Sequence, residues 1–170
     1  MKAYRRGTVE RAVTSSPAAE AEGIRVRRAE EADLLAIHSI EEQSFPAPWP
    51  YRVFERFVGD PGFLVAVDGG RVVGFVVADV VPDNSRPVGH VKDLAVHPSR
   101  RGQGVGTTLL ARSLMVLAGS GVTSVKLEVR ESNENARALY HQFGFEPVHR
   151  ISDYYEDNED AVVLVSELRQ

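Results

Sequence analysis

The sequence contains no cysteine, and this absence excludes a disulfide framework and a cysteine nucleophile. It also lacks an apolar run long enough to span a bilayer, and its first residues do not follow the pattern of a signal peptide. We therefore expect a soluble, cytoplasmic protein that does not associate with a membrane.

Positive charge is also scarce. With 20 Lys and Arg residues against 24 Asp and Glu residues, the formal net charge is −4. A nucleic-acid-binding surface needs an excess of basic side chains, so we predict no nucleic-acid partner. Basic residues do cluster at 25–28 and at 100–101, and five acidic residues lie within 153–160. Each cluster is interpreted either as a solvated face or as a local binding surface.

No set of metal ligands stands out. His38 and Glu41 lie at helical spacing, but no further ligand near them completes a metal site. We therefore predict no metal.

A chain of 170 residues with one evident core-forming region is most simply a single domain. Residues 1–23 are polar and alanine-rich without a sustained period, which predicts a mobile N-terminal extension. The predicted domain spans 24–170.

Glycine is concentrated at one place, where three of five residues are Gly102, Gly104 and Gly106. They lie between a predicted strand over 88–96 and a predicted helix over 107–118. Glycines let backbone N–H groups converge on a ligand, and the helix N-terminus adds partial positive charge. The segment therefore predicts a site for phosphate or pyrophosphate. It lacks the lysine of a nucleotide P-loop and the spacing of a dinucleotide fingerprint.

Hydrophobic periodicity and turn residues predict the other elements. Their order, β-αα-βββ-α-β-α-ββ, indicates an α/β fold with a mixed sheet flanked by helices. Residues 114–118 are expected to be buried, as are Phe57 and Val58. The predicted elements are a strand at 24–28, helices after Asp33 and at 51–58, a hairpin of 63–67 and 71–81, a strand at 122–130, a helix after Asn133, and strands at 145–155 and 161–168.

Residues 44–50 contain three prolines in five positions and two aromatic residues, Phe45 and Trp49. Prolines forbid a helix here and predict a stiff, extended loop. Such a loop either fills the core or forms the wall of a substrate groove.

The spacing of Arg101, Gly104 and Gly106 gives the pattern R-x-x-G-x-G, which resembles the acetyl-CoA pyrophosphate loop of the GNAT family of N-acetyltransferases. Over about 24–168 the chain is similar to archaeal protein N-terminal acetyltransferases and to the bacterial enzyme that acetylates the N-terminal alanine of ribosomal protein S18. The segments that carry the resemblance are 44–49, 90–110, 127–148 and 153–165.

The resemblance implies a single-domain GNAT fold, a mostly antiparallel mixed sheet with splayed central strands, and acetyl-CoA as the donor. Backbone groups of Leu94, Ala95 and Val96 would bind pantetheine, and Asn133 and Tyr140 would approach the thioester. The pyrophosphate would be held by Arg101, Gly102, Gln103, Gly104, Val105, Gly106 and Thr107.

The resemblance also implies catalytic roles. Glu128 matches the general base, His90 matches a histidine of the archaeal enzymes, and Tyr140 is the expected proton donor to sulfur. From the residues alone, Glu128 is equally a strand ion-pair partner, Tyr140 a core residue and His90 structural. The acceptor groove is predicted at Phe45, Pro46, Tyr154 and Tyr155.

An α-amine has a reference pKa of about 7.7 to 8.0, against about 10.4 for lysine, so a modest base suffices to deprotonate it. We therefore predict a protein N-terminal α-acetyltransferase whose acceptor is a protein or peptide N-terminus, with ribosomal proteins as candidates. One alternative is an acetyltransferase for lysine or a small amine. Another is a non-catalytic acyl-CoA-binding partner protein.

Overall fold

The computed structural model describes residues 23–169, so the predicted extension over 1–23 lies outside the described residues except for Gly23. The order of elements matches the prediction. These elements are β1 (Ile24–Arg28), η1 (Glu31–Asp33), α1 (Leu34–Ser44), α2 (Tyr51–Phe57), β2 (Phe63–Asp68), β3 (Arg71–Val81), β4 (Val88–Val96), η2 (Pro98–Arg100), α3 (Val105–Gly119), β5 (Ser124–Arg130), α4 (Glu134–Gln142), β6 (Glu146–Ile151) and β7 (Ala161–Glu167).

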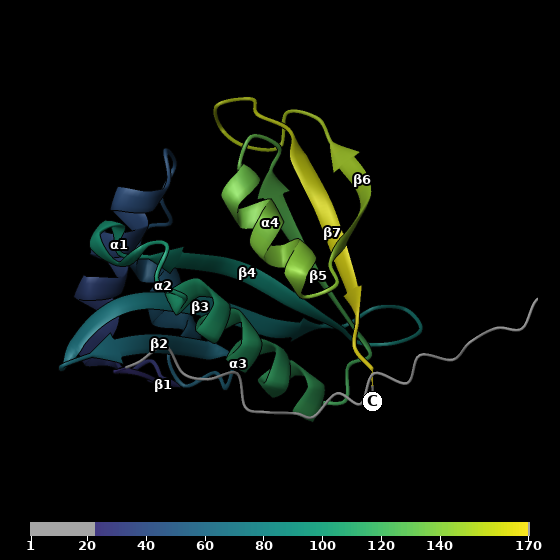
Figure 1. The fold of residues 1–170 in the computed structure, drawn as a ribbon. Helices are drawn as coiled ribbons and strands as arrows, with labels where there is room; N and C mark the ends of the chain where they lie inside the picture. Colours follow the sequence, from purple (N-terminus) through teal and green to yellow (C-terminus); the bar gives the residue numbers. More distant parts are fainter. Residues whose placement is uncertain (1–22, 170) are drawn as a thin grey trace, which may run out of the picture.

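The strands form one sheet in the order β1-β2-β3-β4-β5-β7-β6 (Figure 1). Neighbouring strands are antiparallel except β4 and β5, which are parallel. This parallel pair is short, because only Gly89 and His90 of β4 pair with β5, opposite Val125 and Lys126. Beyond these residues the two strands separate. The predicted mixed, mostly antiparallel sheet with splayed central strands is therefore confirmed.

Helices cover both faces of the sheet, and each face has its own core. On the face of α1 and α2 the core is aromatic, and Phe54 contacts Phe75 edge to face with 5.4 Å between ring centroids. On the other face, α3 and α4 pack through aliphatic residues such as Leu109 and Leu117. Any channel between the splayed strands thus joins two differently packed layers.

Two predictions about burial were wrong. Met115, in the segment expected to be buried, is 63% exposed, because α3 lies on the outside of the sheet and only one side of it meets the core. Val58 is 37% exposed because α2 ends at Phe57 and Val58 leaves the helical conformation.

The strand predicted over 145–155 was also wrong at its end, since β6 stops at Ile151. Asp153 and Asn158 have positive φ angles of 52° and 65°, a left-handed conformation that Asp and Asn tolerate and that interrupts a strand. Residues 152–160 consequently form a loop, and this loop carries both tyrosines of the predicted acceptor groove.

No helix within the described part of the chain is both long and apolar enough to cross a membrane.

Candidate active site

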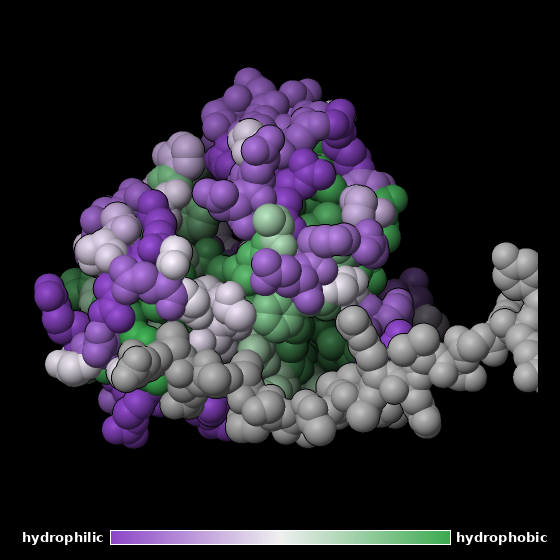
Figure 2. Space-filling view, viewed as in Figure 1, coloured by the Kyte–Doolittle hydropathy of each residue, from purple (hydrophilic) through white to green (hydrophobic). Residues whose placement is uncertain are grey.

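A cavity of about 270 Å³ lies where β4 and β5 separate. Its lining includes Phe45 and Trp49 from the face of α1 and α2, and Ala136 and Tyr140 from α4 on the other face. The cavity therefore passes through the sheet. Viewed from the side of α3 and α4, the surface is hollowed between the α1 side and the α4 side, with hydrophobic residues inside (Figure 2).

Glu128 and His90 meet across the splayed strands. His90 Nε2 lies 2.7 Å from Glu128 Oε2, and each side chain is only 17% exposed. The hydrogen bond from His90 lowers the pKa of Glu128 more than burial raises it. Glu128 lines the cavity as an ionised carboxylate, and His90 supports it from outside the lining. Its position is therefore compatible with both interpretations of Glu128 from sequence, the strand ion-pair partner and the general base.

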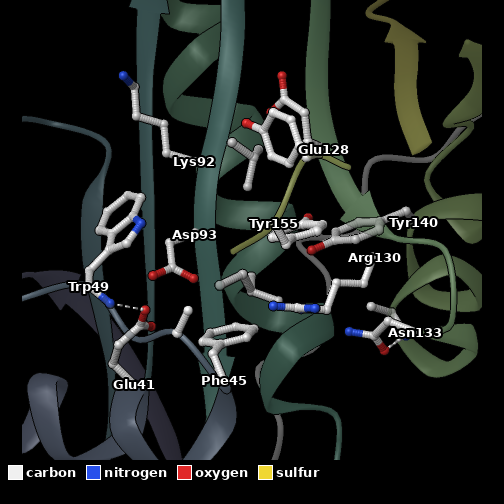
Figure 3. Close-up of a pocket in the computed structure, with 15 residues that line it drawn as sticks. Glu41, Phe45, Trp49, Lys92, Asp93, Glu128, Arg130, Asn133, Tyr140 and Tyr155 are labelled. Atoms are coloured by element: carbon white, nitrogen blue, oxygen red, sulfur yellow. Dashed lines mark hydrogen bonds between the residues drawn. The ribbon is translucent and has the colours of Figure 1, made fainter. Parts of the chain in front are cut away.

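Tyr140 is 7% exposed and packs edge to face on Phe145, so it belongs to the core, and it also lines the cavity (Figure 3). Burial raises the pKa of its phenol well above the ordinary value, and the nearby Asp93 and Tyr155 raise it further. The hydroxyl therefore stays protonated near neutral pH.

The predicted phosphate loop lies at the N-terminus of α3. Gly104 is the N-cap residue with φ +84°, and Gly102 has φ +74°, conformations that favour glycine. The side chain of Arg101 turns back along β4, where Nε donates to the Val96 carbonyl at 3.1 Å and Nη2 donates to Ser44 Oγ at 3.1 Å. Of the remaining loop residues, Gln103 lies between this arginine and the N-cap Gly104, and Val105, Gly106 and Thr107 belong to the first turn of α3.

One edge of β4 beside the cavity has no partner among the strands of residues 23–169. On the β3 side, Leu94, Ala95 and Val96 pair with Val76, Phe75 and Gly74. On the β5 side, pairing ends at His90. Backbone groups of 94–96 on this open edge can bind an extended ligand with amide groups, apart from the Val96 carbonyl that Arg101 occupies.

Of the predicted groove residues in the 44–50 segment, Phe45 lines the cavity and Pro46 does not. Trp49, which sequence analysis did not assign to the site, is also part of the lining. Its indole stacks on Phe57 at 6.0 Å and contacts Phe54 at 5.5 Å. The stiff loop thus has both of the uses considered above: it covers the core and forms a wall of the cavity.

Tyr154 and Tyr155 form the opposite wall, with their rings edge to face at 5.0 Å. Arg130 secures their loop: its guanidinium lies 4.1 Å from the centre of the Tyr155 ring and donates to Asp157 at 2.8 Å and to Glu159 at 3.2 Å. Burial raises the pKa of Tyr155 to about 12. Part of the acidic 153–160 segment is therefore an anchor rather than a solvated face.

The lining also contains a pair of carboxyl groups that was not predicted from the sequence, Glu41 of α1 and Asp93 of β4. Glu41 is only 2% exposed, and its Oε1 accepts a hydrogen bond from the backbone N–H of Trp49 at 2.9 Å. A signal was present, because Glu41 continues the apolar face of Leu34 and Ile37 on α1. No comparable signal marked Asp93. Asn133, which the family resemblance assigned to the thioester end, lines the cavity, and its Oδ1 also accepts the N-cap hydrogen bond from Ala136 N–H.

Residues 34–145 match the model of the Acetyltransferase (GNAT) family. The chain belongs to this family. An N-alpha-acetyltransferase of Sulfolobus acidocaldarius is 34% identical over 155 residues, which cover 84% of this chain and 92% of that protein. The [Ribosomal protein bS18]-alanine N-acetyltransferase of Haemophilus influenzae is 30% identical over 144 residues, which cover 82% and 95%.

Among solved structures, the NatC complex bound to Gag peptide and CoA matches with a TM-score of 0.80 and 24% identity, covering 86% of this chain and 99% of the matched one. This likeness shows the fold. Membership of the GNAT family and the named relatives identify the protein as an acetyltransferase, as the sequence motifs predicted.

Proposed function

We propose that the protein transfers the acetyl group of acetyl-CoA to the α-amine of a protein N-terminus. The observation that carries this proposal is one cavity lined by an ionised carboxylate, Glu128, and a neutral phenol, Tyr140. Acetyl transfer to an amine needs these two groups, a proton acceptor for the amine and a proton donor for the leaving thiolate.

In the proposed reaction, Glu128 takes a proton from the acceptor ammonium directly or through a water molecule. The neutral amine attacks the thioester carbonyl carbon, so that a C–N bond forms and the C–S bond then breaks. Tyr140 gives its hydroxyl proton to the departing sulfur and regains a proton from the attacking nitrogen, which leaves a neutral amide. Glu128 releases its proton to solvent after the product leaves. His90 acts as a positioning residue for Glu128 because it touches the carboxylate at 2.7 Å.

For the donor, we assign the open β4 edge at 94–96 to pantetheine and the 101–107 loop to the pyrophosphate. Support comes from the unpaired strand edge and from the left-handed glycines at the N-terminus of α3. Asn133 and Tyr140 line the cavity near the end of this path, where the thioester would lie.

For the acceptor, we assign the aromatic walls formed by Phe45, Tyr154 and Tyr155, without the predicted Pro46, which lies outside the lining. A protein N-terminus fits a base of this strength better than lysine, because its α-amine is deprotonated more easily by roughly 3 kcal/mol. The relatives named as N-alpha-acetyltransferase and as ribosomal protein alanine N-acetyltransferase support the same choice, with ribosomal proteins as candidate acceptors.

A peptide panel tests the acceptor. Each sequence is made with a free small N-terminal residue and, as its matched control, with a blocked N-terminus and one internal lysine. CoA release should be at least about tenfold faster with the free N-terminus at neutral pH. Faster acetylation of the blocked lysine peptides would instead favour the lysine alternative.

The donor assignment is tested with Gly104→Glu. A side chain here meets both the left-handed backbone and an anion drawn close to it, so acetyl-CoA affinity measured by calorimetry should fall at least about tenfold. Gly59→Glu is the matched control, since Gly59 also has a positive φ, +95°, and apart from its two chain neighbours none of the described residues has an atom within 4 Å of where its Cβ would lie. Equal acetyl-CoA affinity in the two variants would contradict the assignment.

A further inference from the structure

The carboxyl groups of Glu41 and Asp93 face one another beside Trp49 in the cavity wall (Figure 3). Glu41 Oε2 and Asp93 Oδ2 are both buried, and no N–H or O–H group of the described residues donates a hydrogen bond to either oxygen. Two facing carboxyl groups form a hydrogen bond only if one of them is protonated. The geometry thus calls for a proton between them.

This pair joins two segments that are distant in sequence. Glu41 reaches the 45–50 loop, because its other oxygen accepts the Trp49 N–H at 2.9 Å. Asp93 belongs to β4, at the irregularity where the register with β3 shifts after Val91. The chain of contacts from β4 through Asp93 and Glu41 to Trp49 therefore connects the strand assigned to the donor with the wall assigned to the acceptor.

We propose that Glu41 and Asp93 share one proton and that this shared proton holds the 45–50 loop against β4 in the shape that receives the acceptor. Glu41 and Asp93 are then positioning residues. This inference rests on the proposed function where it assigns the loop to the acceptor substrate. Its structural part, that a shared proton holds the loop, does not depend on any activity.

The surroundings favour keeping that proton. Burial raises the pKa of both carboxyl groups, and the proximity of Glu41 raises that of Asp93 further. Lys92, next to Asp93, does not neutralise the pair because it bonds Asp79 at 3.3 Å. The other titratable groups that face the pair or line the same cavity are His38 on α1, Glu128 and Arg130 on β5, Tyr140 on α4, and Tyr154 and Tyr155 in the β6–β7 loop.

Loss of the proton at high pH would leave two buried carboxylates in contact, and their repulsion would release the loop. The variant Asp93→Asn distinguishes the loss of the shared proton from a loss of side-chain packing. An amide donates to Glu41 without needing a proton, so the variant keeps the link at every pH. Asp93→Leu removes the link altogether.

The first measurement uses Trp49 itself, the single tryptophan of the protein, as a probe of the loop. Its emission and its quenching by acrylamide are recorded from about pH 6 to about pH 10 in the wild type, Asp93→Asn and the control Glu42→Gln, which changes an exposed carboxylate on the same helix. The wild type and the control should show the same pH-dependent increase in quenching. Asp93→Asn should not show it.

The second measurement is the acceptor KM for a peptide that the wild type acetylates. The ratio of the wild-type KM to that of Asp93→Asn should rise at least about threefold toward high pH, while acetyl-CoA affinity changes less than about twofold. Because the peptide amine is the same in both reactions, its own titration cancels in the ratio. Asp93→Leu should raise the acceptor KM at every pH.

The outcomes separate the two proposals. A wild type that acetylates no peptide N-terminus contradicts the proposed function, and the Trp49 measurement still tests the pair. A Trp49 signal that is flat with pH in the wild type, or that changes equally in Asp93→Asn, overturns the shared proton whatever the activity. If Asp93→Leu does not fold, the comparison with Asp93→Asn decides alone.

Discussion

Two pairs that contain carboxyl groups lie at the same cavity, and the pKa values of their carboxyl groups are shifted in opposite directions. Glu128 accepts a hydrogen bond from His90, which lowers its pKa in spite of burial. Glu41 and Asp93 face each other, and the pKa values of both are raised. All three carboxyl groups are at least partly removed from water. For Glu128 the hydrogen bond from His90 outweighs burial, whereas burial is the largest cause of the raised pKa values of Glu41 and Asp93. One pair supplies a proton acceptor, and the other retains a proton.

The largest effect is expected from removing Glu128, the proton acceptor of the His90–Glu128 pair. Glu128→Gln should lower kcat by about 10²-fold or more, the usual range for losing a positioned base, while acetyl-CoA affinity stays nearly unchanged. Raising the pH should recover part of the loss, because more of the acceptor amine is then neutral. Steady-state kinetics with Glu55→Gln, an exposed carboxylate on α2, provide the control. A fully active Glu128→Gln enzyme at pH 7 would falsify the assigned base.

A smaller effect is expected when His90 is removed and Glu128, the proposed base, is kept. His90→Ala removes the bond that lowers the Glu128 pKa, so that pKa should rise toward its usual value. The acidic limb of the kcat/KM profile should then move to higher pH, with a loss of several-fold in mildly acidic solution and about twofold or less at pH 8. His90→Gln retains an N–H donor, so its acidic limb should lie close to the pH of the wild-type limb. An acidic limb that does not move in His90→Ala would show that this contact does not tune the base.

The smallest effect is expected on stability. The folded state raises the pKa values of Glu41 and Asp93, so the stability that their protonated form contributes is complete below the unfolded carboxyl pKa of about 4 and is lost as pH rises through the folded values. Asp93→Asn cannot lose this proton. Its Tm should exceed that of the wild type by about 2–4 °C near pH 8, corresponding to on the order of 1 kcal/mol, and the difference should shrink toward pH 4.

For the His90–Glu128 pair, the stability should depend on pH in the opposite direction. Its lowered pKa contributes stability above the unfolded value, and this stability is lost as pH falls through the folded value. Thermal unfolding of Glu128→Gln should therefore differ most from the wild type near neutral pH, and the variant should be the less stable protein. The same pH response in both variants would contradict the contrast between the two pairs.

Local patterns were sufficient for much of the fold. The order of elements and the outward side of Glu128 on β5 follow from alternation, helical spacing and turn residues, which act within a few positions of the chain. The helix predicted over 107–118 begins earlier, at Val105, directly after the left-handed Gly104. The end of β6 did not follow from them. The apolar and aromatic residues up to Tyr155 favour a strand, whereas the left-handed Asp153 stops it.

What the sequence by itself determined is therefore which segments are strands, helices and glycine turns, and by its motifs the family to which the chain belongs. Only the tertiary structure decided which carboxyl groups are charged. His90 meets Glu128 because two strands separate just beyond a short parallel pairing, and Asp93 meets Glu41 because α1 packs on that face of the sheet. A pKa depends on charges and solvent within a few ångströms, and those neighbours come from residues far apart in the chain.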